Sequence, residues 1–289
     1  MAIKSIMNRS KPLVSIVIPV KNNPVGLALL LESIFRQKFS GDFEVIVVDN
    51  DSSDHTREVA RQFPVRLFNQ KKEGSYAARN LGIKNTRSST IAFIDSDCLP
   101  SRTWLGEGLM ALKKKDIDVV AGDIKFIFKK NKPNIYEYLD SVRKLKQKSY
   151  VKSGFSATAN MFIKKNIFSN HGLFNESLLS GGDYEFGQRI TKAGIKIKFS
   201  GGAVVFHPAR NTFIQLVKKT IRVGYGQRKL SRNKTLNHAQ INLFSFLPTI
   251  TLPKNKFYGL FNIFEKIQMI MIINTVKYIN LFIRIFSFK

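Results

Sequence analysis

The chain has few cysteines and few acidic residues for its length of 289 residues. It contains one cysteine, Cys98, and 20 Asp and Glu against 47 Lys and Arg, which gives a formal net charge of +27. A single cysteine excludes an intrachain disulfide and a metal site built from several thiolates, and it favours a reducing compartment such as the cytoplasm. The positive charge predicts an anionic partner: a nucleic acid, an anionic membrane or a phosphate-bearing substrate.

Two common phosphate-binding loops are also missing. The turn after the first apolar run, residues 19–23 (PVKNN), lacks the Gly-x-Gly-x-x-Gly of the usual dinucleotide fold, and the chain has no Walker-type Gly-Lys-Ser/Thr loop. A nucleotidyltransferase of related α/β fold usually carries a Gly-rich basic loop at this point. The apolar run itself is interrupted by Ser15 and Pro19, so it predicts a strand rather than a signal peptide.

The apolar segments alternate between strand-like and helix-like patterns. β-Branched runs at 14–19 and 44–49 predict strands that are covered on both faces, and the helical spacing of the leucines between them predicts a β-α-β unit. Helix-like segments follow at 54–63, 75–85, 103–114, 131–149 and 184–193. Strand-like segments follow at 65–68, 90–94, 119–128, 195–199 and 204–206. This alternation predicts an α/β fold.

Seven of the acidic residues fall into three tight groups, which are Asp49, Asp51 and Asp54, then Asp95 and Asp97, then Asp183 and Glu185. The first two groups follow predicted strands, and ligands of α/β sheets bind beyond the carboxyl ends of strands. Asp95 and Asp97 are one residue apart on an extended chain, so both can point the same way. Their oxygens suit Mg²⁺ or Mn²⁺ carrying a diphosphate, although a solvated turn uses the same residues.

Four motifs in this order resemble glycosyltransferase family 2, whose members have the GT-A fold. They are VSIVIPVKNN at 14–23, EVIVVDNDSSDHT at 44–56, DSD at 95–97 and GGDYEFGQR at 181–189. The resemblance covers about residues 14–210 and implies a catalytic domain over residues 1–210, with a Rossmann-like mixed sheet flanked by helices. It also implies an inverting sugar transfer from a nucleotide-diphosphate donor, with a divalent metal, Mn²⁺ or Mg²⁺, on the Asp-x-Asp element.

The resemblance further implies roles for individual residues. The residues expected at the donor are Pro19, Val20, Asn22, Asp49, Asp51, Ala78, Arg79, Asn80 and Asp95. The metal is expected on Asp97 and Asp95. Asp183 occupies the position of the catalytic base, although a helix N-cap uses the same residue and both roles could hold at once. His207 ends a predicted strand and is a candidate for the metal or the diphosphate, but a lone histidine is more often structural.

The sequence departs from the common family pattern at three places. Gly182 stands where a glutamate is frequent, which leaves the supporting carboxylate open, and Lys21 replaces a frequent aromatic. The Gln-x-x-Arg-Trp motif of processive members is missing, and residues 227–230 (QRKL) are the nearest partial match to it. We therefore expect transfer of a single sugar, to a glycan or a lipid-linked glycan of the cell-envelope polysaccharide type.

The C-terminal region, residues 211–289, is basic and predicted to be helical. From Pro208 onward there are 14 Lys and Arg and one acidic residue. Lys266, Lys277 and Arg284 share one helical stripe of an apolar tail at 257–288, and its longest uncharged stretch, 267–276, is shorter than the roughly 20 residues that span a bilayer. The pattern favours an interfacial helix on anionic lipid at the inner face of the cell membrane, with packing on the catalytic domain or a second subunit as the alternative.

A basic nucleic-acid-binding protein without enzymatic activity is the competing class. Against it, the basic residues of the first half are not interleaved with aromatics, and the acidic groups would repel phosphate unless a metal were bound. We therefore expect a glycosyltransferase that binds no nucleic acid. The identity of the sugar, the nucleotide base and the oligomeric state stay open at this point.

Overall fold

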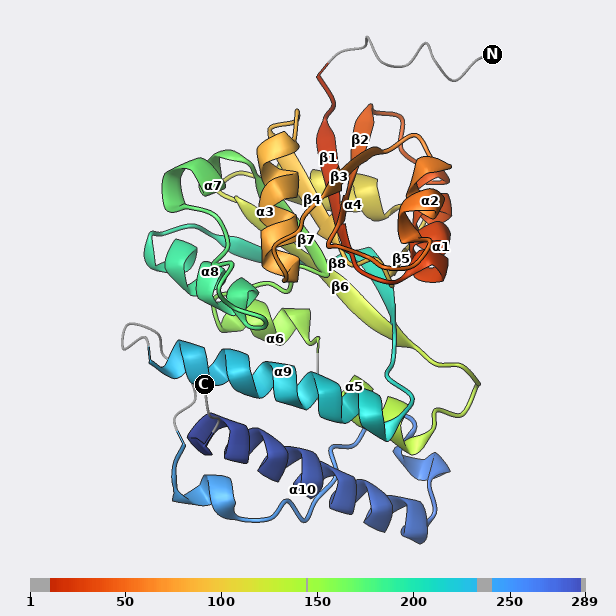
Figure 1. Cartoon of the computed structure of the whole chain (residues 1–289), viewed down its shortest axis with the longest axis vertical. Helices are drawn as coiled ribbons and strands as arrows, with labels where there is room; N and C mark the ends of the chain where they lie inside the picture. The colour runs from red at the N-terminus through yellow and green to blue at the C-terminus, as the bar shows by residue number, and fades with distance from the viewer. Residues whose placement is uncertain (1–10, 144, 233–240, 287–289) are drawn as a thin grey trace.

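A computed structural model describes residues 11–143, 145–232 and 241–286 of the chain (Figure 1). The described residues form one eight-stranded mixed sheet in the order β3-β2-β1-β4-β7-β6-β8-β5. The strands are β1 (Val14–Val20), β2 (Phe43–Asp49), β3 (Arg66–Asn69), β4 (Thr90–Ile94), β5 (Leu99–Pro100), β6 (Val119–Ile127), β7 (Asn160–Lys164) and β8 (Ile197–Pro208). The predicted α/β fold with a mixed sheet is thus confirmed.

Helices cover both faces of the sheet and extend beyond one end of it. They are α1 (Pro24–Phe35), α2 (Thr56–Arg61), α3 (Ser75–Asn85), α4 (Trp104–Leu112), α5 (Ile135–Arg143), α6 (Gln147–Lys152), α7 (Asn166–His171), α8 (Gly182–Lys192), α9 (Phe213–Ser231) and α10 (Ile263–Phe286), with short 3₁₀ turns η2 (Leu243–Phe246) and η3 (Tyr258–Leu260). The helix predicted over 131–149 is therefore two helices, and α9 lies within the region 211–289 that was predicted to be helical, although its bounds were not predicted. The last predicted tail residues, 287–289, lie outside the described residues.

The parallel part of the sheet positions the acidic groups. β1 pairs in parallel with β2 and with β4, and every residue of β1 is buried. The β-branched side chains of these strands pack against α1 and α4 on one face and against α3 and α8 on the other. Because the carboxyl ends of parallel strands meet at one edge, the segments after β1, β2 and β4 come together there.

The antiparallel part is held by one buried asparagine, Asn160. Its Nδ2 donates to the carbonyl oxygens of Asp123 and Ala203, each at 2.8 Å, and its Oδ1 accepts from Trp104 Nε1 at 2.9 Å. These bonds join β7 to β6, β8 and α4, and they satisfy a side chain that is fully buried. The long strands β6 and β8 therefore leave the sheet in a fixed direction toward α5 and α9 (Figure 1).

β8 differs from the prediction of two short strands at 195–199 and 204–206. It pairs with β6 before and after an irregularity, with Gly122 opposite Ser200 and Asp123 opposite Val204. The extra residues include Gly201 and Gly202, and a β-bulge tolerates glycine where a sequence pattern reads a turn. The strand therefore continues to Pro208 and carries His207 to its end.

The C-terminal helices share an apolar cluster with α5. The buried members of this cluster are Tyr138, Leu139, Val142, Leu216, Leu252, Phe261, Met269 and Ile273. Figure 1 shows α9 lying between the sheet and α10. The predicted boundary after residue 210 therefore divides a shared cluster, because α5 belongs to the part before the boundary and packs with α9 and α10.

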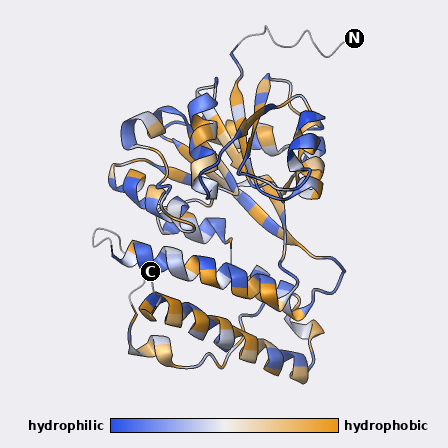
Figure 2. Cartoon of the chain, in the orientation of Figure 1, coloured by the Kyte–Doolittle hydropathy of each residue, from blue (hydrophilic) through white to orange (hydrophobic). Residues whose placement is uncertain are grey.

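The outer surface of α10 is apolar rather than basic (Figure 2). Phe264 is 75% exposed and Phe282 is 58% exposed. Two residues of the predicted basic stripe contact the segment before α10 instead. The Lys266 amine lies 4.5 Å from the Tyr258 ring, and the Lys277 amine donates to the carbonyl of Leu247. The whole helix is also long and apolar enough to cross a membrane, which its uncharged stretch alone did not indicate.

A buried ion cluster connects α9 to the end of β8. The Asp140 carboxylate on α5 is 1% exposed and lies 2.7 Å from Lys219 Nζ and 3.2 Å from Arg210 Nη1. It also accepts the backbone N–H of Arg210 at 3.2 Å. Burial alone would raise the pKa of Asp140, but Lys219 and Arg210 together hold it below its ordinary value.

We predict that Asp140→Asn lowers the free energy of unfolding by about 3 kcal/mol. Removing one partner of a buried ion pair costs about 3–5 kcal/mol, because the remaining charge is left uncompensated. The partial exposure of Arg210 places the expected loss at the lower end of that range. Because the pKa of Asp140 is lower in the folded state, this contribution is complete above the unfolded value of about 3.9 and is lost as the pH falls through the folded value. Chemical denaturation at pH 7 and below pH 3 measures both effects. Glu32→Gln, which breaks an exposed pair with Arg36, is the control and should change little.

Candidate active site

A cleft of about 560 Å³ opens where β1 and β4 end, between α3, α8 and α9. It brings together residues that are far apart in the sequence. Those that carry the chemistry are Pro19, Asn23, Tyr76, Arg79, Asp95, Asp97, Asp183, His207, Lys219, Arg222 and Gln227. Both members of the second acidic group, Asp183 of the third and His207 converge there, whereas the first group, which was expected at the same edge of the sheet, does not line the cleft.

Asp95 is held by a buried arginine. Arg79 Nη2 lies 2.5 Å from Asp95 Oδ1, and the Arg79 side chain is only 5% exposed. The guanidinium carbon also lies 5.5 Å from the centre of the Tyr76 ring. Arg79, from the predicted donor segment, therefore orients and neutralises one carboxylate of the Asp-x-Asp element.

Asp97 and His207 form a pair of candidate metal ligands. His207 Nδ1 lies 2.7 Å from the carbonyl oxygen of Pro208, and because a carbonyl can only accept, this bond assigns the proton to Nδ1. In the neutral imidazole, Nε2 then carries the lone pair, and it lies 3.8 Å from Asp97 Oδ2. Such a bond to the second ring nitrogen is what orients histidine ligands in metal sites.

Cys98 completes a group of three potential ligand atoms with Asp97 and His207, all within 4.8 Å of one another. Burial raises the pKa of the Cys98 thiol well above its ordinary value, and the neighbouring Asp97 and Asp95 carboxylates add to that shift. A protonated thiol is a poor ligand. The carboxylate and the imidazole remain, and this oxygen and nitrogen donor set fits Mn²⁺ or another divalent ion.

Asp183 lies in the first turn of α8, and the N-cap of that helix is Gly181. The alternative role of Asp183 as the helix N-cap is therefore not what the structure shows. Its Oδ1 accepts from the Tyr76 hydroxyl at 3.3 Å and from the backbone N–H of Tyr184 at 3.0 Å. Burial raises the pKa of Asp183, with Arg79 opposing part of the shift. A raised pKa suits a general base.

Tyr76 explains the glycine at position 182. A Cβ added at Gly182 would lie 2.7 Å from the Tyr76 ring, so the tyrosine fills the space that a larger residue would need. Burial and the charge of Asp183 raise the pKa of Tyr76, so its hydroxyl remains a hydrogen-bond donor at neutral pH. Tyr76 thus supports Asp183 where the common family pattern has a glutamate.

Glu185 is not available as a substitute base. Its two carboxylate oxygens accept from Arg189 Nε at 3.0 Å and Nη2 at 3.1 Å, one helical turn further along α8. It is also absent from the residues that line the cleft. Within the third acidic group of the sequence, only Asp183 reaches the cleft.

Two of the three residues expected from the first turn line the site, and the third does not. Pro19 lines the cleft, and Val20 lines an adjoining pocket of about 280 Å³. Asn22, at φ +50°, instead joins two turns, since its Oδ1 accepts the backbone N–H of Ser53 at 2.9 Å. Its neighbour Asn23 lines the cleft, donates to Ser96 Oγ at 3.2 Å and caps α1, and the sequence analysis did not single it out.

Three other predicted donor residues are engaged within the protein. The buried Asp49 carboxylate lies 2.6 Å from Arg57 Nε, and the exposed Asp51 lies 3.4 Å from Arg57 Nη2. Asn80 is buried and bonds to the backbone N–H and carbonyl of Phe174. None of the three is among the residues that line the cleft or the adjoining pocket. Their contact with a donor stays a prediction.

α9 closes the cleft on the side away from the sheet. It contributes a polar edge of Lys219, Arg222 and Gln227. The helix approaches the loop before α8 closely, because a Cβ at Gly226 would lie 2.3 Å from the Ser180 carbonyl oxygen. Residues 227–230 (QRKL), the nearest match to the Gln-x-x-Arg-Trp motif, were the one feature of the sequence that could have placed α9 at the site.

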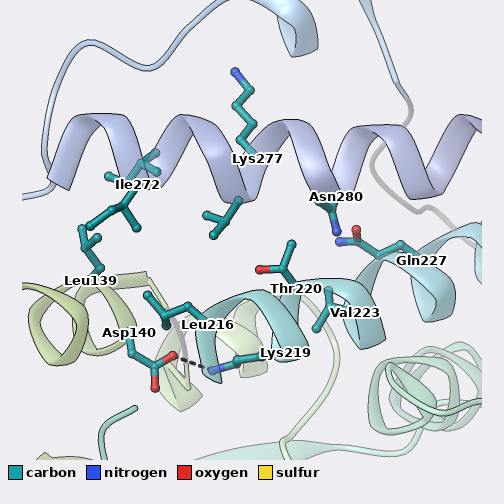
Figure 3. A pocket seen from close by; sticks show the side chains of 12 residues that line it. Leu139, Asp140, Leu216, Lys219, Thr220, Val223, Gln227, Ile272, Lys277 and Asn280 are labelled. Carbon is teal, nitrogen blue, oxygen red and sulfur yellow. Dashed lines mark hydrogen bonds and ion pairs between the residues drawn. The ribbon is translucent and has the colours of Figure 1, made fainter. Parts of the chain in front are cut away.

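A second cavity, of about 230 Å³, lies between α9 and α10 (Figure 3). Lys219, Val223 and Gln227 line both this cavity and the cleft, so α9 is the wall between them. The Gln227 Oε1 atom is buried and has no hydrogen-bond partner in the described part of the chain. Figure 3 shows Gln227 and Asn280 pointing toward one another within the cavity.

Two solved structures resemble the chain in fold. A mannosyltransferase from Pyrobaculum calidifontis, PcManGT, in complex with GDP-Man and Mn²⁺, matches with a TM-score of 0.60 at 15% identity over 95% of this chain and 70% of that chain. S. aureus TarS, residues 1–349, in complex with UDP-GlcNAc, matches with a TM-score of 0.56 at 17% identity over 82% of this chain and 76% of that chain. At these identities the likeness shows the GT-A fold alone.

Sequence comparison identifies the family. Residues 15–172 match the model of glycosyl transferase family 2. The glycosyltransferase AglE of Haloferax volcanii is 35% identical over 229 residues, which is 76% of this chain and 75% of that protein. A chondroitin synthase of Escherichia coli is 26% identical over 78% of this chain and 41% of its own length. The chain is therefore a member of glycosyl transferase family 2, and it is a transferase with the GT-A fold.

Proposed function

We propose that the cleft binds a nucleotide-diphosphate sugar and transfers its sugar, with inversion, to an acceptor hydroxyl. The observation that carries the proposal is the presence in one cleft of Asp183, whose pKa is raised by burial, with Asp95, Asp97 and His207. The GDP-Man and UDP-GlcNAc bound to the structural neighbours support a donor of this class.

The donor set at the cleft fits a divalent metal. Asp97 and His207 would hold the ion, with Asp95 beside them, and Mn²⁺ in the PcManGT complex supports this assignment. A bound metal would stabilise the negative charge that develops on the departing diphosphate. Arg79 pairs with Asp95 at 2.5 Å and so orients this carboxylate beside the proposed ion.

The chain's own residues supply the proton transfer and the orientation. Asp183 accepts the proton of the acceptor hydroxyl as that oxygen forms its bond to the anomeric carbon and the bond from this carbon to the diphosphate oxygen breaks. The leaving nucleoside diphosphate keeps the electron pair. Tyr76 holds one oxygen of Asp183. The remaining donor contacts are proposed at Pro19, Val20, Asn22, Asp49, Asp51 and Asn80.

We further propose that the protein acts on a glycan or lipid-linked acceptor while bound to the inner face of the cell membrane. The C-terminal region presents a broad apolar surface whose large exposed members are Phe244, Phe246, Leu247, Ile250, Leu260, Ile263, Phe264, Ile267, Met271, Tyr278, Phe282, Ile285 and Phe286. The opposite side of α10 packs on α5 and α9 through Met269 and Ile273. Such one-sided burial favours a helix lying in the interface over one surrounded by lipid.

Donor binding is expected to require both metal and nucleoside diphosphate. The melting temperature of the parent protein should rise with Mn²⁺ and GDP or UDP together, because a ligand that binds only the native state stabilises it. Asp97→Asn should abolish that rise while the melting temperature without ligand stays unchanged, since the side chain is 43% exposed. Glu58→Gln on α2 is the matched control. A full rise in Asp97→Asn would place the metal elsewhere.

Asp183→Asn is expected to lower turnover by 10²- to 10⁴-fold, the usual contribution of positioned acid–base catalysis, roughly 3–5 kcal/mol of barrier. Donor affinity should stay the same. The melting temperature at neutral pH should not fall, because the raised pKa means that the ionised carboxylate costs stability once the pH exceeds the unfolded value. Steady-state kinetics and calorimetry measure these quantities. Turnover within a few-fold of the parent would remove Asp183 from the mechanism.

The apolar surface is tested with vesicles. The parent protein should sediment with phosphatidylglycerol vesicles, and Phe264→Ser with Phe282→Ser should weaken this at least about tenfold, because burying a phenylalanine contributes about 1.5–3 kcal/mol. Val25→Ser with Met110→Ser removes equally exposed apolar side chains elsewhere and should leave binding intact. A parent protein that stays in the supernatant at low salt would contradict membrane binding.

A further inference from the structure

A basic groove of about 760 Å³ lies beside the donor cleft. It is formed by the end of β6, the end of β8 and the polar side of α9, and we refer to it as the basic groove. Five cationic side chains line it, namely Lys129, Arg210, Lys218, Lys219 and Arg222. None of these residues was assigned a role by the sequence motifs.

The basic groove is continuous with the catalytic centre. Asp97 and His207, the candidate metal ligands, line both the basic groove and the donor cleft. Lys129 and Lys218 line the basic groove and no part of the donor cleft. A molecule in the basic groove would therefore lie beside Asp97 and His207 at the reacting centre.

Two of the five cations share one internal counter-charge. Arg210 and Lys219 pair with the buried Asp140 beneath the groove. For the other three, Lys129, Lys218 and Arg222, the described part of the chain shows no ion pair. Three exposed cations without an ion-pair partner among the described residues thus line one concave surface.

Two acidic residues line the basic groove, Asp97 and Glu137, and together with the buried Asp140 they offset three of its five positive charges. Glu137 is buried, and its two oxygens accept the backbone N–H groups of Lys129 at 3.0 Å and Asn134 at 2.8 Å. These bonds fold the segment between β6 and α5 and so place Lys129 at the rim. The remaining formal charge of the basic groove is positive, and an anionic ligand would balance it.

We propose that the basic groove binds a phosphate group carried by the acceptor, an inference that rests on the transferase function proposed above. A phosphate accepts several charge-assisted hydrogen bonds at once, which separated Lys and Arg side chains can donate. The diphosphate of the donor does not account for Lys129 and Lys218, because neither lines the donor cleft. The phosphate could belong to a lipid or to a soluble molecule, and the test below separates these sources.

Binding is measured by calorimetry with the full chain and three probes: farnesyl phosphate, farnesol and inorganic phosphate. Lys129→Gln with Lys218→Gln should raise the Kd for farnesyl phosphate at least about tenfold, since two charge-assisted contacts are lost. Farnesol binding should not change. Farnesyl phosphate binding should weaken as salt rises in the parent and less so in the variant. Tighter binding of farnesyl phosphate than of inorganic phosphate assigns the site to a lipid, and equal binding assigns it to a soluble phosphate.

Lys114→Gln with Lys115→Gln, two exposed lysines after α4, is the matched control and should keep the parental Kd. The double variant should also keep the parental stabilisation by Mn²⁺ and nucleoside diphosphate. If that stabilisation is absent from the parent, the proposed function fails. If it is present but the variant binds farnesyl phosphate as tightly as the parent, the phosphate site alone is overturned.

Discussion

The carboxylate of Asp140 ties α9 to α5 and to the segment that follows β8. It is almost fully buried and pairs with Arg210, just after β8, and with Lys219 on α9. His207 is three residues before Arg210, and Arg222 is one helical turn after Lys219. One ion cluster thus sets both the candidate metal ligand and the wall of the cleft, and a buried charge that loses its partners is costly.

The parallel half of the fold and the main acidic residues of the cleft were predictable because they depend on local patterns. β-Branched runs define β1, β2 and β4, and the chain must place the residues after such strands at one edge. Asp95 and Asp97 therefore lie at that edge, whereas Asp183, in the first turn of α8, was identified only through its motif. Asn80 fits its motif equally well, yet it is buried against Phe174, because a motif identifies a segment but not the direction of each side chain.

The remaining features depend on contacts between distant segments. Tyr76 gains its role only because Gly182 leaves room for its ring, and α9 reaches the cleft only because Gly226 permits close approach to Ser180. The glycines of β8 read as a turn but form a bulge that lengthens the strand. For α10, helical periodicity gives the angles between side chains, but the packing of α5 and α9 decides which side is exposed.

The central claim is that this cleft transfers a sugar from a nucleotide diphosphate. The most direct measurement is mass analysis after the full chain is incubated with Mn²⁺, a panel of nucleotide sugars and a lipid extract. The expected result is one acceptor that gains the mass of a single sugar, together with an equal amount of released nucleoside diphosphate. Release of no nucleoside diphosphate from any donor, with the protein folded and the metal present, would contradict the claim.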